Sequence, residues 1–403
     1  MKFAVIGGGI SGLTAAYRLT QSGATVKVFE DATRLGGKIF TLNDWHESLE
    51  GGPDAFLTRT PDILRLVGEL GIADELISPS ASRALLYRGG KVRGFPPGLS
   101  LGAPVSARQM FDVELLSPLE RLIGYLTMRT SFLRPSRSDD LGLRASRAFS
   151  RRYAEVVLDP LIGGINAGTI FGTSLDVAAP QLRALIEGTS PPTTSRPSSM
   201  QSSPFASHPR GLSTLIERLE SAILENGGSL LPGAPVNLIE LGAHGWRIKA
   251  QGKRVERFDG VVMATPAHVS AQLLRATSPK VASLLDAIRY SSVSVAVLRT
   301  KRLRLAFDSS YSGVLVARNE GAMSTAITLA DAKWPHWADE DHSVLRISTG
   351  NVNDRRHLGL GDEVLAATLR AEAEEILATQ ILVEDVKVVR WQKSFPQFAP
   401  YHT

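Results

Sequence analysis

The chain of 403 residues contains no cysteine. This absence excludes disulfides, thiolate metal sites, iron–sulfur clusters and a cysteine nucleophile. Histidine is also scarce, and no two of the 8 histidines have a metal-ligand spacing such as H-E-x-x-H. We therefore expect no metal site. The sequence also contains no recognisable catalytic triad or pair of carboxylates, so the identity of any catalytic residue stays unknown at this point.

The sequence also contains no stretch of about 18 apolar residues, the length that a transmembrane helix requires. The apolar start of the chain leads into glycines and a helical pattern, which indicates a first strand and not a signal peptide. The net charge of +5 comes mostly from scattered arginines, without a basic helix that would indicate nucleic-acid binding. We expect a cytoplasmic protein with no transmembrane segment and no nucleic-acid partner. The oligomeric state is not predicted.

The first residues carry the most informative pattern. The apolar run Phe3–Ile6 leads into Gly7-Gly8-Gly9-Ile10-Ser11-Gly12, a G-x-G-x-x-G motif, and then into a helical pattern. In such a turn the first glycine permits the bend, the second admits a pyrophosphate, and the third lets helix and strand pack closely. A second strand over 25–29 ends at Glu30, close to the offset of a carboxylate that accepts ribose hydroxyls. The pattern predicts a dinucleotide-binding unit; the alternative is an ordinary strand–turn–helix with incidental glycines.

The stretch after Glu30 favours FAD over a nicotinamide cofactor. Arg34-Leu35-Gly36-Gly37-Lys38 places a glycine pair between two cations. A glycine pair lets the backbone run along an extended cofactor, and Arg34 or Lys38 can neutralise its diphosphate. The alternative interpretation is a glycine-rich surface loop with two solvated cations.

The order of predicted elements indicates an α/β fold with interleaved domains. The expected parts are an FAD-binding domain over 1–80 and 206–275, a substrate domain with a helical part over 81–205 and a sheet part over 276–390, and the start of a C-terminal FAD segment over 391–403. Among the elements, we expect a hairpin over 84–95 and one helix over 140–157. A Ser-, Thr- and Pro-rich linker is expected over 189–209.

These pieces together resemble the bacterial FAD-dependent porphyrinogen oxidases of haem synthesis, over nearly the whole chain and in order. The most particular marks are Gly52-Pro53-Asp54, the block from Asp159-Pro160-Leu161 to Gly168, and Pro396-Gln397-Phe398. The resemblance implies a two-domain flavoprotein of the amine-oxidase-like superfold, with a Rossmann-type FAD-binding domain and an inserted α+β substrate domain. One rival is an amine oxidase or carotenoid desaturase, which shares only the first glycine motifs. Another is a non-catalytic relative that binds porphyrin or partner proteins.

The resemblance also assigns site residues. The predicted cofactor-binding positions are Gly7, Gly8, Gly9, Ile10, Ser11, Gly12, Glu30, Asp31, Arg34, Gly37, Lys38, Gly52, Pro53, Asp54, Ala55, Val236 and Trp391. The predicted substrate-binding positions are Arg83, Gly164, Asn166 and Gly168. Guanidinium groups suit the carboxylates of an otherwise apolar macrocycle, although a solvated arginine is the alternative for Arg83. For Trp391 the alternative is a core tryptophan.

The implied reaction is the six-electron oxidation of coproporphyrinogen III to coproporphyrin III in three rounds, with O2 as acceptor and H2O2 as product. Coproporphyrinogen is favoured over protoporphyrinogen IX because the match is best to the bacterial branch and because no membrane-embedding apolar patch is evident in the sequence.

Two departures from the family pattern carry expectations of their own. Asn166 stands where the family usually has an aromatic residue and Thr169 where it has an aspartate, which predicts an altered preference among macrocycles. The sequence ends at Thr403, whereas family members continue for several dozen residues that include a glycine-rich FAD segment. From this difference we expect weak retention of flavin during purification.

Overall fold

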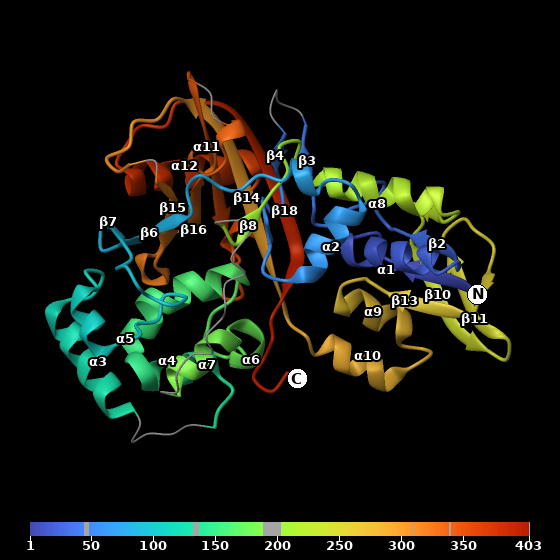
Figure 1. The fold of residues 1–403 in the computed structure, drawn as a ribbon, viewed down its shortest axis with the longest axis horizontal. Helices are drawn as coiled ribbons and strands as arrows, with labels where there is room; N and C mark the ends of the chain where they lie inside the picture. The colour runs from blue at the N-terminus through green and yellow to red at the C-terminus, as the bar shows by residue number, and fades with distance from the viewer. Residues whose placement is uncertain (44–47, 132–136, 188–202, 309, 338–339, 403) are drawn as a thin grey trace. The chain divides into compact units, whose positions relative to one another are not determined.

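The computed structural model describes residues 1–43, 48–131, 137–187, 203–308, 310–337 and 340–402. The chain folds into two compact units, each built from two separate stretches (Figure 1). Unit 1 comprises Met1–Pro79 and Gln201–Ile288, and unit 2 comprises Ser80–Met200 and Arg289–Thr403. The predicted linker over 189–209 lies outside the described residues as far as residue 202.

Unit 1 is built on a parallel sheet with the strand order β13-β1-β2-β9. Strand β1 (Lys2–Ile6) lies between β2 (Thr25–Phe29) and β13 (Gly260–Met263), and β9 (Ser229–Leu231) forms the edge. Helix α1 (Ile10–Gln21) provides the crossover from β1 to β2 that a parallel pair requires. The sheet is covered on both faces, which explains why β1 is a nearly continuous apolar run.

The two faces of this sheet have different covers. On one face Val5, Val26 and Val28 pack against α1, α2 (Pro61–Glu69) and α8 (Ser213–Glu225). On the other face Ala4 and Ile6 pack against an antiparallel sheet formed by β10 (Val236–Gly242), β11 (Gly245–Ala250) and β12 (Glu256–Phe258). The remaining elements of unit 1 are β3 (Thr41–Leu42), β4 (Leu49–Glu50), β5 (Phe56–Leu57), β8 (Phe205–Ala206), α9 (Ala267–Leu274) and α10 (Pro279–Asp286).

Unit 2 contains a seven-stranded sheet with the order β18-β14-β17-β16-β15-β6-β7. Its strands are β6 (Arg83–Arg88), β7 (Lys91–Gly94), β14 (Tyr290–Lys301), β15 (Tyr311–Val316), β16 (Ser324–Leu329), β17 (His342–Thr349) and β18 (Val383–Pro396). The pairing of β6 with β15 is parallel, and the other pairings are antiparallel. Helix α12 (Asp362–Leu377) packs on one face of the sheet through Leu365, Leu369 and Ile376 (Figure 1).

The second core of unit 2 is mainly helical. Its helices are α3 (Pro118–Thr130), α4 (Leu141–Phe149), α5 (Arg151–Tyr153), α6 (Leu175–Ala178) and α7 (Arg183–Ile186), with α11 (Ala330–Lys333) elsewhere in the unit. The prediction of one helix over 140–157 is wrong, because the helix is interrupted at Ser150, whose φ of 98° is incompatible with a right-handed helix. After α5 the chain forms a π-helix over Ala154–Gly163.

Helix α3 exposes an apolar face. Leu119, Leu122, Ile123 and Leu126 recur at the spacing of one helix face, and all four are exposed, Leu119 to 66%. These residues form an apolar surface patch on α3, because a helical spacing of apolar residues does not by itself show which face is buried. Within the described ranges no helix combines the length and the apolar character needed to cross a membrane.

Two expected domain boundaries can be compared with the units. The boundary expected after residue 275 falls between α9 and α10, which both belong to unit 1. The boundary expected after residue 390 falls inside β18, which pairs with β14 along its whole length, from Val383 to Pro396. The α/β character of the chain is confirmed by the parallel sheet of unit 1 and its covering helices.

Candidate functional site

The turn between β1 and α1 shows which glycines the protein itself requires. A Cβ at Gly7, whose φ is +106°, would lie 2.7 Å from the carbonyl oxygen of Ala264. A Cβ at Gly12 would lie 1.9 Å from the carbonyl oxygen of Gly7, so only glycine lets α1 begin this close to β1. At Gly9 the backbone is extended, and only the Cα of Gly37, at 3.9 Å, lies near the Cβ position. No other atom of a described residue lies within 4 Å of that position, so a ligand can approach the backbone there.

Helix α1 begins beside this open position without a side-chain cap. Its N-cap residue is Gly9, and its first turn contains no acidic residue. The N–H groups of the first turn, which include those of Ile10, Ser11 and Gly12, have no acceptor within an α-helix. Together with the helix dipole they favour an anion at this end of α1.

Glu30 lies at the end of β2 against the glycine turn. Its Oε2 accepts a hydrogen bond of 2.6 Å from the N–H of Gly8, and its Oε1 accepts one of 2.9 Å from the N–H of Ala32. Each carboxylate oxygen has further acceptor capacity, which suits ribose hydroxyls. The neighbouring Asp31 is exposed.

The second glycine motif is joined directly to the first. The N–H of Gly36 donates to the carbonyl oxygen of Gly8 over 2.8 Å, and Gly9 and Gly36 form a parallel bridge. Gly37 has φ +58°, and a Cβ there would lie 3.1 Å from the Cα of Gly9. Gly9 and Gly37 thus form a floor of bare backbone beside the N-terminus of α1.

The two cations of this motif differ in what they contact. Arg34 donates to the carbonyl oxygens of Leu35, Gly37 and Ile39 at 2.7–3.1 Å and stacks 4.4 Å from the ring centre of Phe40. The guanidinium of Arg34 therefore holds the backbone of the loop 35–39 in its conformation. Lys38 is exposed and forms no hydrogen bond or ion pair with any described residue. The protein around Lys38 lowers the pKa of its ammonium group by desolvation. Because backbone carbonyls use the donors of Arg34 and the Lys38 side chain has no partner among the described residues, Lys38 is the cation available to an anionic ligand.

The Gly52-Pro53-Asp54 turn packs against the same loop. A Cβ at Gly52 would lie 2.0 Å from the carbonyl oxygen of Lys38, which explains the glycine. Pro53 is exposed, and Asp54 and Ala55 are half-buried.

Glu50, which ends β4 two residues before Gly52, joins this segment to Thr41 and to the start of α8. Its carboxylate is completely buried and accepts hydrogen bonds from the N–H of Leu212 at 2.5 Å and from the hydroxyl of Thr41 at 3.1 Å. Leu212 is the N-cap residue of α8, and its side chain cannot cap the helix. The carboxylate of Glu50, on β4, accepts the N–H of Leu212 at this helix end instead.

Val236 begins β10 close to the end of β2, because the N–H of Ala234 donates to the carbonyl oxygen of Glu30 over 2.8 Å. Trp391 belongs to unit 2, where it lies on β18 opposite Val293 and is half-buried. Every other predicted cofactor residue lies in unit 1.

The residues of unit 1 fit a dinucleotide-bearing flavin. They provide an unfilled space over Gly9 and Gly37, uncapped N–H groups on α1, an exposed lysine, and a carboxylate at the end of β2. Groups of three or more His, Asp or Glu side chains able to hold a metal ion do not occur in the described part of the chain.

The four predicted substrate residues lie in unit 2. Arg83 donates to the hydroxyl of Tyr311 over 2.9 Å and stacks 4.5 Å from its ring centre. Gly164 has no atom within 4 Å of its Cβ position, and the half-buried side chain of Asn166 forms no hydrogen bond with any described residue. Gly168 faces the interior, because a Cβ there would lie 2.2 Å from Oε1 of Gln397.

Sequence reasoning missed one residue beside this loop. Nε of Arg318 donates over 2.7 Å to the buried carboxylate of Asp159, and Nη2 donates to the carbonyl oxygen of Gly168. No motif contains Arg318, so nothing in the sequence pointed to it.

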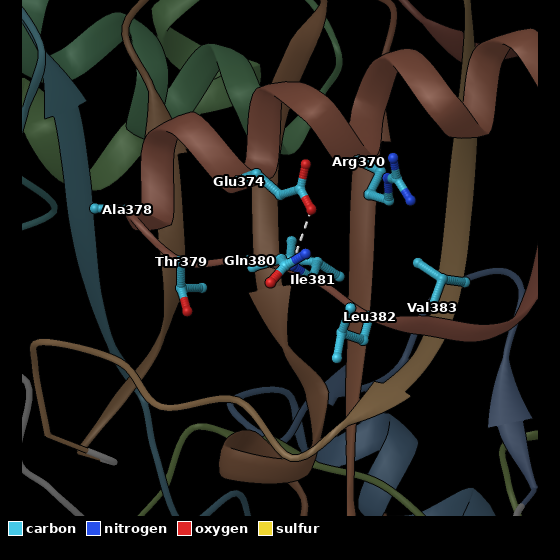
Figure 2. A pocket seen from close by; sticks show the side chains of 8 residues that line it. All are labelled: Arg370, Glu374, Ala378, Thr379, Gln380, Ile381, Leu382 and Val383. Carbon is cyan, nitrogen blue, oxygen red and sulfur yellow. Dashed lines mark hydrogen bonds between the residues drawn. The ribbon is translucent and has the colours of Figure 1, made fainter.

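A separate hollow of about 630 Å³ lies in unit 2 at the C-terminal end of α12 (Figure 2). Glu374 accepts a hydrogen bond of 2.9 Å from the N–H of Ile381 there, and Arg370 lines the same hollow. The hollow is wide open and mostly polar, and none of the predicted site residues lines it.

The chain is similar to known flavoproteins along its length. The family described as flavin containing amine oxidoreductase matches residues 10–403. The chain is 29% identical over 409 residues to the coproporphyrinogen III oxidase of Mycobacterium tuberculosis (strain ATCC 25618 / H37Rv), covering 100% of this chain and 88% of that protein.

Solved structures agree with this similarity. A structure described as a protoporphyrinogen oxidase from Exiguobacterium sp. 255-15 matches with a TM-score of 0.84 and 26% identity, covering 99% of this chain and 88% of that one. Cyclohexylamine oxidase from Brevibacterium oxydans IH-35A shares the fold, with a TM-score of 0.66 and 18% identity over 99% and 88% of the two chains. The resemblance inferred from the motifs and the predicted amine-oxidase-like fold are confirmed.

Proposed function

The chain belongs to the family of flavin-containing amine oxidoreductases, and from that premise we propose that it is a cytoplasmic FAD-dependent oxidase that converts coproporphyrinogen III to coproporphyrin III. One observation carries the proposal: the similarity to a coproporphyrinogen III oxidase extends over the whole of this chain. The similarities to porphyrinogen oxidases and the family match support a flavin oxidoreductase related to porphyrinogen oxidases.

Unit 1 supplies the residues that would hold FAD. The open floor at Gly9 and Gly37 would receive the diphosphate, with the first turn of α1 and Lys38 opposing its charge. The carboxylate of Glu30 would accept hydrogen bonds from the ribose hydroxyls. When FAD is bound, the chemistry that it supplies is the acceptance of a hydride from a substrate carbon and the transfer of two electrons to O2, giving H2O2.

Unit 2 would bind and orient the macrocycle through the loop Gly164–Gly168. Gly164 leaves open space for a flat ring, and the amide of Asn166 is available to a peripheral polar group. We assign no described side chain of unit 2 to proton transfer. Its proposed contribution is therefore to bind and orient the substrate.

The deciding experiment is the growth of porphyrin fluorescence after the protein, supplied with FAD in air, is mixed with coproporphyrinogen III or protoporphyrinogen IX. Faster growth with coproporphyrinogen III than in a protein-free autoxidation control is the expected result. A much faster rate with protoporphyrinogen IX would identify that compound as the substrate instead of coproporphyrinogen III. The similarity to the Exiguobacterium structure is the reason to test this alternative. Equal rates with and without protein would reject the oxidase.

A further inference from the structure

We propose that Arg318 is a positioning residue for substrate: together with Gln397 it fixes the backbone of the loop Gly164–Gly168, so that Gly164, Ile165 and Asn166 face the macrocycle in one arrangement. The substrate part of this inference rests on the proposed function. The positioning part rests only on the contacts within unit 2.

Arg318 links the loop to the π-helix that precedes it. Its guanidinium bridges the carboxylate of Asp159 and the carbonyl oxygen of Gly168, while Oδ1 of Asp159 accepts the N–H of Ile170 over 2.8 Å. The C-terminal end of the loop is thus tied, directly at Ile170 and through Arg318 at Gly168, to a buried carboxylate of the π-helix that leads into the loop. An arginine suits this role because its planar fork can serve two acceptors in fixed directions.

The glycine at residue 163 is explained by the same contacts. A Cβ at Gly163 would lie 2.8 Å from Oδ1 of Asp159, 3.2 Å from Nη2 of Arg318 and 3.2 Å from the carbonyl oxygen of Gly168. Any side chain would therefore enter the space in which Arg318 contacts the loop, so this glycine serves the fixed backbone and not the approach of substrate.

Gln397 fixes the middle of the loop from the other end of the chain. Its Nε2 donates to the carbonyl oxygen of Asn166 over 2.9 Å and to the hydroxyl of Ser291 over 3.1 Å. The N–H of Gln397 donates to the carbonyl oxygen of Arg289 over 2.8 Å, which holds its own backbone in place. Gly168 has no side chain because the Gln397 amide occupies that position.

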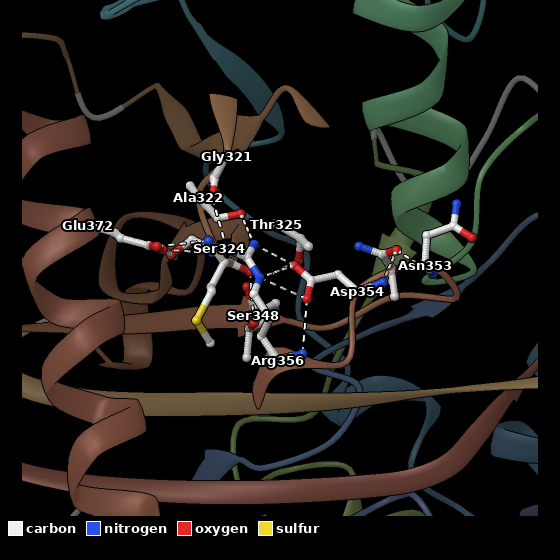
Figure 3. Close-up of polar contacts among 12 residues, drawn as sticks. Gly321, Ala322, Ser324, Thr325, Ser348, Asn353, Asp354, Arg356 and Glu372 are labelled. Atoms are coloured by element: carbon white, nitrogen blue, oxygen red, sulfur yellow. Dashed lines mark hydrogen bonds and ion pairs between the residues drawn. The ribbon is translucent and has the colours of Figure 1, made fainter. Parts of the chain in front are cut away.

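A third contact comes from the segment after β17. The N–H of Val352 donates to the carbonyl oxygen of Ala167 over 2.9 Å. This segment is itself rigidly held, because Arg356 contacts Asp354 and the carbonyl oxygens of Gly321 and Ala322 (Figure 3). Consecutive carbonyl groups of the loop, those of residues 166, 167 and 168, are therefore all bound to the protein.

The face that remains carries the recognition groups. Ile165 is 71% exposed, Gly164 has open space at its Cβ position, and the Asn166 amide has no partner among the described residues. An apolar side chain, a bare backbone and an amide in a fixed order suit an apolar ring with polar groups at its edge. Loss of the fixed backbone would disorder these three residues without touching unit 1.

The test uses the FAD-loaded protein and the variants Arg318→Met, Arg318→Lys and Gln397→Leu. The matched control is Arg302→Met, which removes another arginine–aspartate contact of unit 2, that of Arg302 with Asp331 at 2.9 Å. Hydrogen–deuterium exchange of peptides covering 163–170 is measured first, because it needs no substrate. Exchange should become at least roughly tenfold faster in Arg318→Met and Gln397→Leu, less so in Arg318→Lys, and stay unchanged in Arg302→Met.

Steady-state kinetics then separates positioning from general damage. We expect the KM for coproporphyrinogen III to rise roughly tenfold in Arg318→Met, with partial rescue in Arg318→Lys and an unchanged flavin content. Unchanged exchange at 163–170 in both Arg318→Met and Gln397→Leu would overturn the positioning role. Faster exchange with an unchanged KM would overturn the link to substrate. A wild-type protein without any oxidase activity would reject the proposed function, while the exchange data would still decide whether Arg318 fixes the loop.

Discussion

The carboxylate of Glu30 and the N–H of Gly8 are joined by a hydrogen bond of 2.6 Å. The residue expected to bind the ribose is therefore tied to the glycine turn expected to bind the diphosphate. The two parts of the candidate cofactor site form one rigid corner, made by residues that are 22 positions apart. Substitutions at this corner can distinguish packing from cofactor binding.

Gly12→Ala and Gly9→Ala should have opposite signatures. The Cβ at residue 12 would collide with the Gly7 carbonyl, so we expect a loss of stability of about 1–3 kcal/mol. The Cβ at residue 9 meets only the Cα of Gly37, so we expect a cost under about 1 kcal/mol but at least a roughly tenfold weaker affinity for FAD. Urea unfolding of the flavin-free protein and a flavin fluorescence titration measure the two effects. Equal FAD affinity in Gly9→Ala and wild type would place the diphosphate elsewhere.

Lys38→Met and Arg34→Met should differ in the same way. The Lys38 side chain forms no hydrogen bond or ion pair with a described residue, so its loss should leave the urea midpoint unchanged and weaken FAD binding several-fold, with a smaller effect at high salt. Arg34 serves three backbone carbonyls, so its loss should lower stability by about 1–3 kcal/mol. The measurements are urea unfolding without flavin and FAD titration at two salt concentrations. A salt-independent change in FAD affinity in Lys38→Met would contradict an electrostatic role.

Glu120 should stabilise unit 2 above acidic pH. Desolvation raises the pKa of Glu120, but hydrogen bonds from Arg88, Ser117 and Arg152 outweigh it and lower the pKa to about 2. This stabilisation is present above the ordinary pKa of 4.5 and is lost as pH falls towards 2. We expect Glu120→Gln to destabilise the protein by about 1–2 kcal/mol at pH 7 and by less at pH 3, measured by urea unfolding.

The control for this prediction is Glu114→Gln, because the Glu114 side chain is 67% exposed and its contact with Arg93 is 3.3 Å long. It should change the midpoint little at either pH. If Glu114→Gln lowered stability as much as Glu120→Gln does, the contacts of Glu120 with Arg88, Ser117 and Arg152 would not be the cause of the effect.

His357 should make the protein less stable as pH falls. The residue is buried, and neither ring nitrogen has a hydrogen-bond partner in the part of the chain that the structure describes. Burial lowers the pKa of His357 below its usual 6.5, with Asp354 opposing the shift and Arg390 adding to it. The neutral ring is therefore favoured in the folded state, and stability is lost as pH falls below 6.5.

The variant His357→Phe keeps the buried ring and removes the titration. The urea midpoint of the variant should fall less than that of wild type between pH 8 and pH 5.5. The remaining fall has another source in His208, whose pKa is lowered by desolvation while Glu75 opposes the shift. Identical falls in variant and wild type would exclude His357 as a contributor.

The parts of the structure that the sequence predicted are those with local signals. The unit β1–α1–β2 is defined within about 30 residues by an apolar run, glycines and one acid, so each signal lies next to the element that it specifies. The break at Ser150 was missed because the apolar spacing continues past it into the π-helix. The expected helix included only residues 154–157 of the π-helix, which is too short a stretch for the wider i→i+5 spacing to show in the apolar pattern.

The contacts that position the candidate substrate loop could not be predicted from the sequence, because they join residues that are far apart along the chain. Arg318 and Asp159 are 159 residues apart, and Gln397 and Asn166 are 231 apart. Likewise, Arg34 and Lys38 are equivalent cations in the motif, and only the geometry shows that backbone carbonyls use the donors of Arg34. Sequence motifs predicted which loops form the candidate sites, but the partners of each side chain depend on non-local packing.

The interleaved strands have a consequence for how the chain matures during translation. β1 lacks its neighbour β13 until residue 263 has been made, and β6 lacks β15 until residue 316 has been made. At about 5–20 residues per second, the ribosome needs roughly ten to fifty seconds to add the intervening residues. During that interval β1 and β6 have open edges, which are the positions at which a nascent chain is prone to aggregate and at which chaperones bind. The order of strands in the finished sheets thus sets how long the newborn chain stays vulnerable.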